Sequence, residues 1–203
     1  MKKPYSVLLK LKTPFHWCYH CNVPVLDRVC SLCERDTLRI KITPPGDVYP
    51  VLYEKQRKEI RDILLRYFES IKDAEKFLPS KKMVFLNQIS NVDAADEIIV
   101  DGQIIGHRIF DPIKRVWRFK PLLSGVAKII NERIGYYAIV SLPKIARRFI
   151  IHRSHILEQN LPESRGEFVA LQTKDGVFQG VGEVVRGKRI KVLKVWKSKK
   201  YIE

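Results

Sequence analysis

All four cysteines of the chain fall within one short segment, as two C-x-x-C pairs. Cys18 pairs with Cys21, and Cys30 pairs with Cys33. Two tight turns of this kind can bring four thiolate sulfurs to a single metal ion, each at about 2.3 Å. We predict that the four cysteines bind a structural Zn²⁺ ion. Four protein ligands leave no open position for water, so metal-assisted catalysis is not expected at this site.

Other uses of the four cysteines fit the sequence less well. Two disulfides would suit a secreted protein, but Lys10 and Lys12 interrupt any apolar signal segment. A redox C-x-x-C needs only one pair. His16 and His20 stand beside the first pair as rival ligands. Sulfur ligands suit iron as well as zinc, so the spacing favours a four-thiolate site and leaves the metal open between the two.

The flanking segments predict how the four cysteines are positioned. Tyr5–Lys12 and Thr37–Ile42 alternate apolar with polar or charged side chains, which is typical of strands. Only eight residues separate the two cysteine pairs, so we expect a compact zinc ribbon or rubredoxin-like knuckle. Three prolines and a glycine in residues 43–50 then mark a boundary. Residues 1–45 are therefore predicted to form a small zinc-ribbon domain.

Residues 46–135 combine helical and strand patterns, which predicts an α+β middle domain. Apolar residues between Tyr53 and Ile71 recur at spacings of three and four, as in one long helix. Asp101-Gly102 stands between two apolar runs and predicts a β-hairpin. Further strands are expected at 83–89 and 116–120, and a second helix at 122–133.

Residues 136–203 show a different pattern, in which short strands alternate with glycine-containing turns. This pattern predicts a small β-barrel, an arrangement that leaves no exposed strand edge. Pro143–Phe149 is expected to form a short basic helical turn, and Lys174–Gly176 to turn a hairpin. The predicted fold class of the whole chain is thus α+β. The expected strands of the barrel are 136–141, 167–173, 177–185 and 189–196.

The chain carries 38 Lys and Arg residues against 22 Asp and Glu residues, a formal net charge of +16. Residues 136–203 hold 14 basic and 6 acidic residues, so about a third of the length carries +8, half of the excess. A basic surface concentrated in this way is typical of proteins that bind polyanions. No amphipathic helix accompanies the charge, and no apolar run is long enough to span a bilayer. We therefore expect a cytoplasmic protein whose partner is nucleic acid rather than a membrane.

Four segments of the last third resemble a PUA domain in their order and spacing. They are Tyr137–Ser141, Gly166–Ala170, Asp175–Gly182 and Lys191–Val195. PUA domains are the small RNA-binding pseudobarrels of pseudouridine synthases and archaeosine transglycosylases. Residues 96–135 resemble the smaller domain that often precedes PUA in such proteins. The resemblance implies a PUA-like RNA-binding domain at residues 136–203.

The resemblance also implies which residues would face RNA. In PUA domains the RNA lies against the short helix, the loop after it and nearby strands. Arginine can bind a phosphate through two hydrogen bonds, histidine can stack on a base, and lysine adds attraction to phosphate. The matching and neighbouring residues of this chain are Arg147, Arg148, His152, Arg153, His155, Asn160, Lys191 and Lys194.

A second resemblance covers the whole chain. A cysteine knuckle, a middle domain and a PUA unit in this order resemble the N-terminal part of archaeal phosphoadenosine phosphosulfate reductase-like proteins. The sequence holds neither G-x-x-x-x-G-K-[ST] nor G-x-G-x-x-G, and no cysteine outside the two pairs. We predict an RNA-binding protein with structural zinc that assists tRNA or rRNA modification or processing and is not itself an enzyme. The alternative is a recruitment module or subunit of a phosphoadenosine phosphosulfate reductase-like or RNA sulfur-transfer enzyme.

Overall fold

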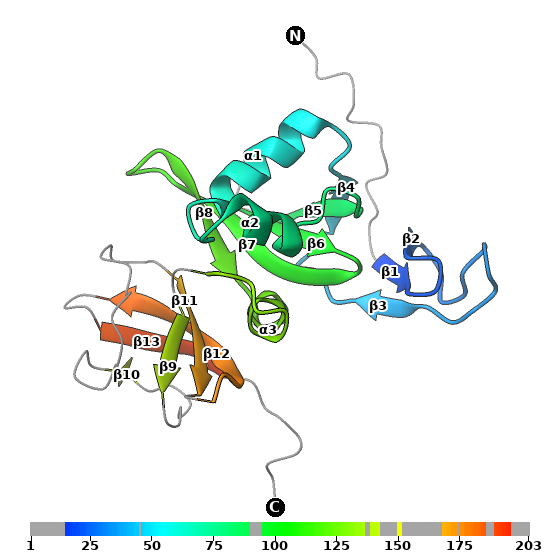
Figure 1. Cartoon of the computed structure of the whole chain (residues 1–203). Helices are drawn as coiled ribbons and strands as arrows, with labels where there is room; N and C mark the ends of the chain where they lie inside the picture. Colours follow the sequence, from blue (N-terminus) through cyan, green and yellow to red (C-terminus); the bar gives the residue numbers. More distant parts are fainter. Residues whose placement is uncertain are drawn as a thin grey trace, which may run out of the picture. The chain divides into compact units, whose positions relative to one another are not determined.

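The structure is a computed structural model, and its elements are shown in Figure 1. By internal contacts the chain divides into two compact units. The first comprises Met1–Asp62 and Leu78–Arg118, and the second comprises Ile63–Phe77 and Phe119–Glu203. The predicted division at residues 45 and 135 stays a prediction. The structure describes residues 15–44, 46–89, 95–136, 139–142, 150–151, 168–173, 175–185 and 189–195.

The first unit begins with a small antiparallel sheet of the predicted ribbon type. Its strands lie in the order β2-β1-β3. The third strand falls inside the predicted strand Thr37–Ile42, whereas the predicted strand Tyr5–Lys12 lies outside the described residues. The strands are β1 Phe15–Cys18, β2 Val23–Val25 and β3 Leu38–Ile40.

A five-stranded sheet follows, in the order β4-β5-β6-β7-β8, with antiparallel pairing from β4 to β7. The predicted hairpin at Asp101-Gly102 is confirmed. Both residues have a positive φ, 48° and 72°, as a tight hairpin turn requires. The strands are β4 Asp47–Pro50, β5 Val84–Gln88, β6 Ala95–Val100, β7 Gln103–Asp111 and β8 Val116–Pro121.

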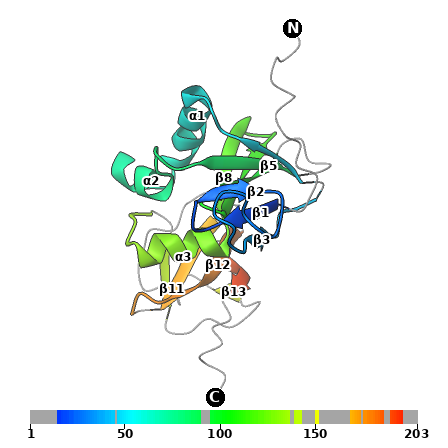
Figure 2. The same ribbon diagram turned by 90° about the vertical axis from the view of Figure 1, so that its right-hand side faces the viewer.

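Both faces of this five-stranded sheet are covered, since every residue of β6 is buried. Helix α1, Glu54–Leu64, lies along the sheet (Figure 1), and its Arg57 donates hydrogen bonds to the carbonyls of Ser80 and Lys82 just before β5. Figure 2 shows the ribbon in front of the sheet. Phe15 and Trp17 of the ribbon pack there in one cluster with Val48, Phe85 and Ile99. The ribbon and the middle sheet therefore share a hydrophobic core.

The single long helix predicted for Tyr53–Ile71 is wrong. The chain leaves helical conformation after Leu64 and begins a second helix, α2, at Ile71–Phe77. Ser70 caps this helix, because its hydroxyl oxygen accepts a hydrogen bond from the Asp73 backbone N–H at 3.1 Å. Ile71, which the periodicity placed on an apolar face, is 61% exposed.

The second unit contains another five-stranded sheet, in the order β10-β13-β12-β11-β9, on which helix α3, Leu123–Asn131, packs against β12. Its pairs are antiparallel except for β9 with β11. Within the described residues, β9 and β10 form the two edges, so the predicted closure into a barrel is not observed. The strands are β9 Ile139–Leu142, β10 Ile150–Ile151, β11 Phe168–Thr173, β12 Phe178–Val185 and β13 Arg189–Val195.

A buried polar network fastens the segment after the ribbon to the middle sheet. The Glu97 carboxylate accepts hydrogen bonds from the Thr43 backbone N–H at 3.0 Å, the Thr43 hydroxyl at 2.6 Å and the Asn87 amide at 2.6 Å. Burial opposes ionisation of Glu97, but the interaction with His107 and these hydrogen bonds outweigh it and lower its pKa to about 2. The ionised carboxylate is thus part of the folded core.

The β6–β7 turn makes a close approach to the ribbon that a side chain would prevent. A Cβ on Gly102 would lie 2.4 Å from the Trp17 ring, and Gly102 also has a φ of +72°. Gly176 has a similar φ of +75° but meets nothing within 4 Å. Substitution of these two glycines therefore distinguishes the effect of backbone strain, which both share, from the effect of a steric clash, which only Gly102 would have.

We predict that Gly102→Ala lowers the free energy of unfolding by about 2–5 kcal/mol, because overpacking adds to the strain of the left-handed backbone. Gly176→Ala, the control, should cost about 1–2 kcal/mol from backbone strain alone. Urea unfolding of the full chain measures both. Equal losses in the two variants would show that the Trp17 contact does not restrict the turn.

The network around Glu97 predicts a loss of stability in acid. Its pKa falls from the ordinary value of 4.5 to about 2 on folding, so its contribution is complete above pH 4.5 and is lost as the pH falls toward 2. The contribution is about 3 kcal/mol at neutral pH. Wild-type stability should therefore fall more than that of Glu97→Gln between pH 5 and pH 2.5. Glu59→Gln, on exposed helix surface, is the control and should follow wild type; parallel curves for all three proteins would contradict the assignment.

Candidate metal centre

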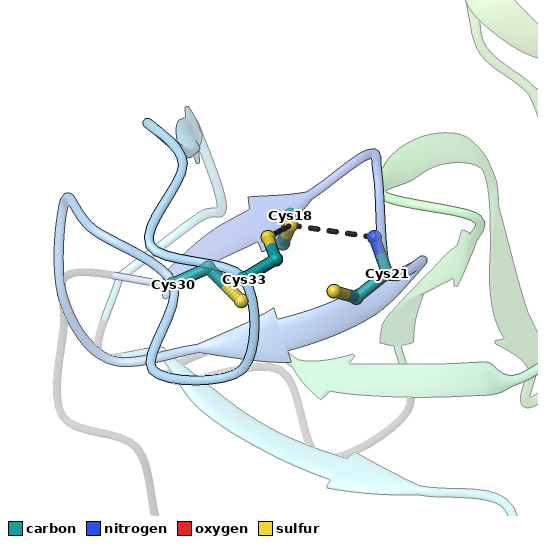
Figure 3. A group of neighbouring side chains, drawn as sticks. All are labelled: Cys18, Cys21, Cys30 and Cys33. Carbon is teal, nitrogen blue, oxygen red and sulfur yellow. Dashed lines mark hydrogen bonds between the residues drawn. The ribbon is translucent and has the colours of Figure 1, made fainter.

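The four cysteine sulfurs converge on one point of the ribbon, as Figure 3 shows. All four lie within 4.8 Å of one another, and the Cys18 and Cys33 sulfurs are 3.6 Å apart. Sulfurs at about 2.3 Å from a tetrahedral metal ion are about 3.8 Å apart, so the spacing fits one ion. A disulfide needs about 2.05 Å, and all four cysteines are unbonded. The predicted cluster of Cys18, Cys21, Cys30 and Cys33 is confirmed as a group that can hold a metal.

Two similar turns present the sulfurs. Each turn has a left-handed residue directly after its second cysteine, Asn22 with a φ of 55° and Glu34 with a φ of 55°. Asparagine accepts this conformation readily, whereas glutamate does so at a cost. In the first turn the Cys21 backbone N–H donates to the Cys18 sulfur at 3.4 Å. The local backbone is thus bent at both positions so that each pair of cysteines faces inward.

Without a cation the site does not favour ionisation of all four thiols. The hydrogen bond from the Cys21 N–H, opposed by burial, lowers the pKa of Cys18 to about 7. Hydrogen bonding to Cys33, together with burial, raises the pKa of Cys21 to about 12. Four thiolates therefore need a positive ion among them, and binding one would release protons. A bound ion would supply a tetrahedral crosslink between the two turns.

The two histidines considered as rival ligands are engaged elsewhere. His16 Nδ1 lies 3.1 Å from the Thr37 hydroxyl, and His20 Nδ1 lies 3.0 Å from an Arg35 guanidinium nitrogen. Among the described residues the only group that can hold a metal consists of the four cysteines. A donor set of four sulfurs suits zinc or iron, and the identity of the ion stays a prediction.

Two side chains, Asn22 and Tyr19, fasten the first cysteine turn to the β6–β7 hairpin. The Trp17 indole N–H donates to the Asn22 side-chain oxygen at 3.1 Å, and the Asn22 amide donates to Asp101 at 3.0 Å. The Tyr19 hydroxyl donates to the Gly102 carbonyl at 3.2 Å. Sequence reasoning missed these residues because nothing local relates two turns that lie about eighty positions apart. The position of the cysteine cluster is therefore tied to the middle sheet.

The predicted RNA-facing residues fall into two groups. Lys191 and Lys194 are exposed on β13, opposite Glu183 and Val181 of β12. No described helix is both long and apolar enough to cross a bilayer. The roles of all eight residues stay predictions. Those that lie outside the described residues are Arg147, Arg148, His152, Arg153, His155 and Asn160.

Comparison with known proteins gives one similar sequence and similar folds. No family model matches the chain. It is 35% identical over 143 residues, 70% of its length, to the uncharacterized protein MJ0066 of Methanocaldococcus jannaschii, and the match spans 28% of that protein's length. None of the comparisons supports the resemblance to phosphoadenosine phosphosulfate reductase-like proteins.

Two archaeal structures resemble the chain. The hypothetical protein PH0734.1 of Pyrococcus horikoshii has a TM-score of 0.52 at 20% identity, over 76% of this chain and 97% of that one. A conserved PUA domain protein of Thermoplasma acidophilum has a TM-score of 0.49 at 12% identity, over 75% and 96% of the two chains. At this identity the likeness to PH0734.1 shows a related fold and nothing about activity.

The cysteine cluster predicts a metal content that can be measured. The purified chain should carry one metal ion per molecule, and Cys30→Ser/Cys33→Ser should carry none and unfold at a lower temperature. Elemental analysis with thermal unfolding tests both statements and distinguishes zinc from iron. Ser31→Ala, in the same turn, is the control and should keep the ion. A metal-free wild-type chain that is as stable after supply of zinc or iron as before would contradict the assignment.

Proposed function

We propose that the chain is an RNA-binding protein whose N-terminal ribbon is stabilised by a zinc ion on four cysteines. Its partner is a structured RNA, tRNA or rRNA, and it assists modification or processing of that RNA. The charge carries the proposal: a formal net charge of +16, half of it in residues 136–203. Nucleic acid is the polyanion that such a surface attracts most directly.

The C-terminal sheet supports this proposal. Ile190 and Val192 of β13 are buried, while Lys191 and Lys194 of the same strand are exposed. The strand therefore presents ammonium groups to solvent without weakening the core. The sequence resemblance to PUA domains implies that Arg147 and Arg148 also contact RNA. We propose that this exposed face of a PUA-like sheet lies against RNA.

Each kind of residue has a distinct role in such an interface. Lys191 and Lys194 attract phosphates and release condensed counterions, which makes binding strongly dependent on salt. Arg147, Arg148 and Arg153 can hold phosphates with paired hydrogen bonds. His152 and His155 can stack on unpaired bases, and the amide of Asn160 can read a base edge. The metal takes no part in chemistry, because four cysteine ligands leave no position for a substrate.

A salt titration of RNA affinity tests the proposal. The logarithm of the affinity for a tRNA should fall steeply with the logarithm of salt concentration, by about 0.9 per phosphate contact. Lys191→Gln/Lys194→Gln should reduce that slope by about 1 to 2, and Arg147→Ala/Arg148→Ala/Arg153→Ala should reduce it further. Lys55→Gln/Lys58→Gln, on exposed surface of α1, is the control.

Two results would contradict the proposed interface. A chain that binds no RNA at low salt would overturn the function itself. A chain whose affinity falls equally in the control and in the two C-terminal variants would bind RNA through some other surface.

A further inference from the structure

The ribbon has an open groove that none of the four cysteines lines. It is lined by His16, Arg28, Asp36, Thr37 and Arg39, and its volume is about 490 Å³. This volume lies within the range of about 300–1,000 Å³ that is usual for small-molecule sites. All five residues belong to the ribbon, so the groove lies within the first unit.

The ribbon sheet places a histidine and an arginine side by side in this groove. His16 of β1 lies directly opposite Arg39 of β3 in the antiparallel register. Side chains of directly opposed residues project from the same face of a sheet. Trp17, the next residue, projects from the other face into the shared core. The sheet therefore separates its apolar face from a polar face that carries the groove.

Hydrogen bonding fixes which nitrogen of His16 carries the proton. The Thr37 hydroxyl has one hydrogen, which it donates to the Asp27 carbonyl at 2.7 Å. Its contact of 3.1 Å with His16 Nδ1 must then be a hydrogen bond that Nδ1 donates. In the neutral ring the other nitrogen, Nε2, is an acceptor. Among the described residues nothing donates to it, although His16 is only 5% exposed.

His16 Nε2 is not among the buried side-chain atoms that lack a partner, so it stays accessible. An accessible acceptor on a residue that lines the groove suits a ligand that supplies an N–H or O–H. The groove also has two arginines and one aspartate, a formal charge of +1 with His16 neutral. Guanidinium groups bind phosphate through paired hydrogen bonds. The fitting ligand therefore has a phosphate and, close to it, a hydroxyl group that can donate. A ribonucleotide has both, whereas a deoxyribonucleotide lacks the 2′-hydroxyl.

We propose that this groove binds one ribose-phosphate unit of RNA. Arg28 and Arg39 hold the phosphate, and the ribose 2′-hydroxyl donates a hydrogen bond to His16 Nε2. Asp36 accepts a hydrogen bond from a second donor of the nucleotide, such as a base amino group. The site rests on the proposed RNA-binding function and adds a contact that selects RNA over DNA.

The test uses the full, metal-bound chain and three oligonucleotides of one sequence: RNA, its 2′-fluoro form and DNA. Neither the 2′-fluoro form nor DNA can donate from the 2′ position. Wild type should bind RNA about tenfold more tightly than the 2′-fluoro form, the factor that corresponds to one hydrogen bond of about 1.4 kcal/mol. This comparison changes only the ligand, so folding of a variant does not affect it.

The protein side is tested with Arg28→Gln/Arg39→Gln against the control Lys55→Gln/Lys58→Gln, after metal content and thermal stability are shown to be unchanged. The arginine variant should lower the slope of log affinity against log salt concentration by about 1.4, because two phosphate contacts of a single strand contribute about 0.7 each. It should also abolish the preference for RNA over the 2′-fluoro form. The control should keep that preference.

The outcomes separate this inference from the proposed function. Equal wild-type affinity for RNA and the 2′-fluoro form would overturn the ribose contact. An arginine variant that behaves like the control, while Lys191→Gln/Lys194→Gln weakens binding, would overturn the groove and leave the function standing. A wild-type chain that binds no RNA would overturn both.

Discussion

Repulsion among four thiolates in one small volume is the interaction on which the N-terminal part of the structure depends. The sulfurs lie within 4.8 Å of one another, and local hydrogen bonds lower the pKa of Cys18 while the pKa of Cys21 is raised. A divalent cation would remove this repulsion and crosslink the two turns. Leu26, Val29 and Leu32 around these turns are all more than half exposed, so burial of apolar surface does not hold them. A bound metal ion would therefore contribute what a core would otherwise supply.

The positions of the cage and of the middle sheet depend on each other. Asn22 stands directly after the first cysteine pair in left-handed conformation, and its side chain bridges the Trp17 indole and Asp101. At the other end of the ribbon, Thr43 is held by the buried Glu97 carboxylate. Phe15, Trp17 and Ile40 then belong to a core shared with the sheet. The polar face that carries the His16 groove is consequently held in a fixed orientation on that sheet.

The sequence predicted features that depend on neighbouring residues and missed those that depend on distant ones. The two C-x-x-C pairs and the Asp101-Gly102 turn could be predicted because spacing and backbone preference determine them locally. The break between α1 and α2 was missed, because the cap at Ser70 and the contacts of Phe68 with Phe77 and Tyr136 outweigh a continuous helical pattern. The glycine turns predicted closure of a barrel, which is not observed among the described residues. Turn residues determine local hairpins and do not determine whether two edge strands pair. The His16 groove could not be foreseen, since it needs the register of β1 with β3.

Amide hydrogen exchange with and without the metal tests the central claim most directly. If the ion holds the ribbon and the ribbon holds the β6–β7 turn, removing the ion should speed exchange in β1–β3 and at Asp101 and Gly102. Exchange in β11–β13, which belong to the second unit, should stay unchanged. Unchanged exchange across β1–β3 after complete removal of the ion, or equal acceleration throughout the chain, would contradict the account.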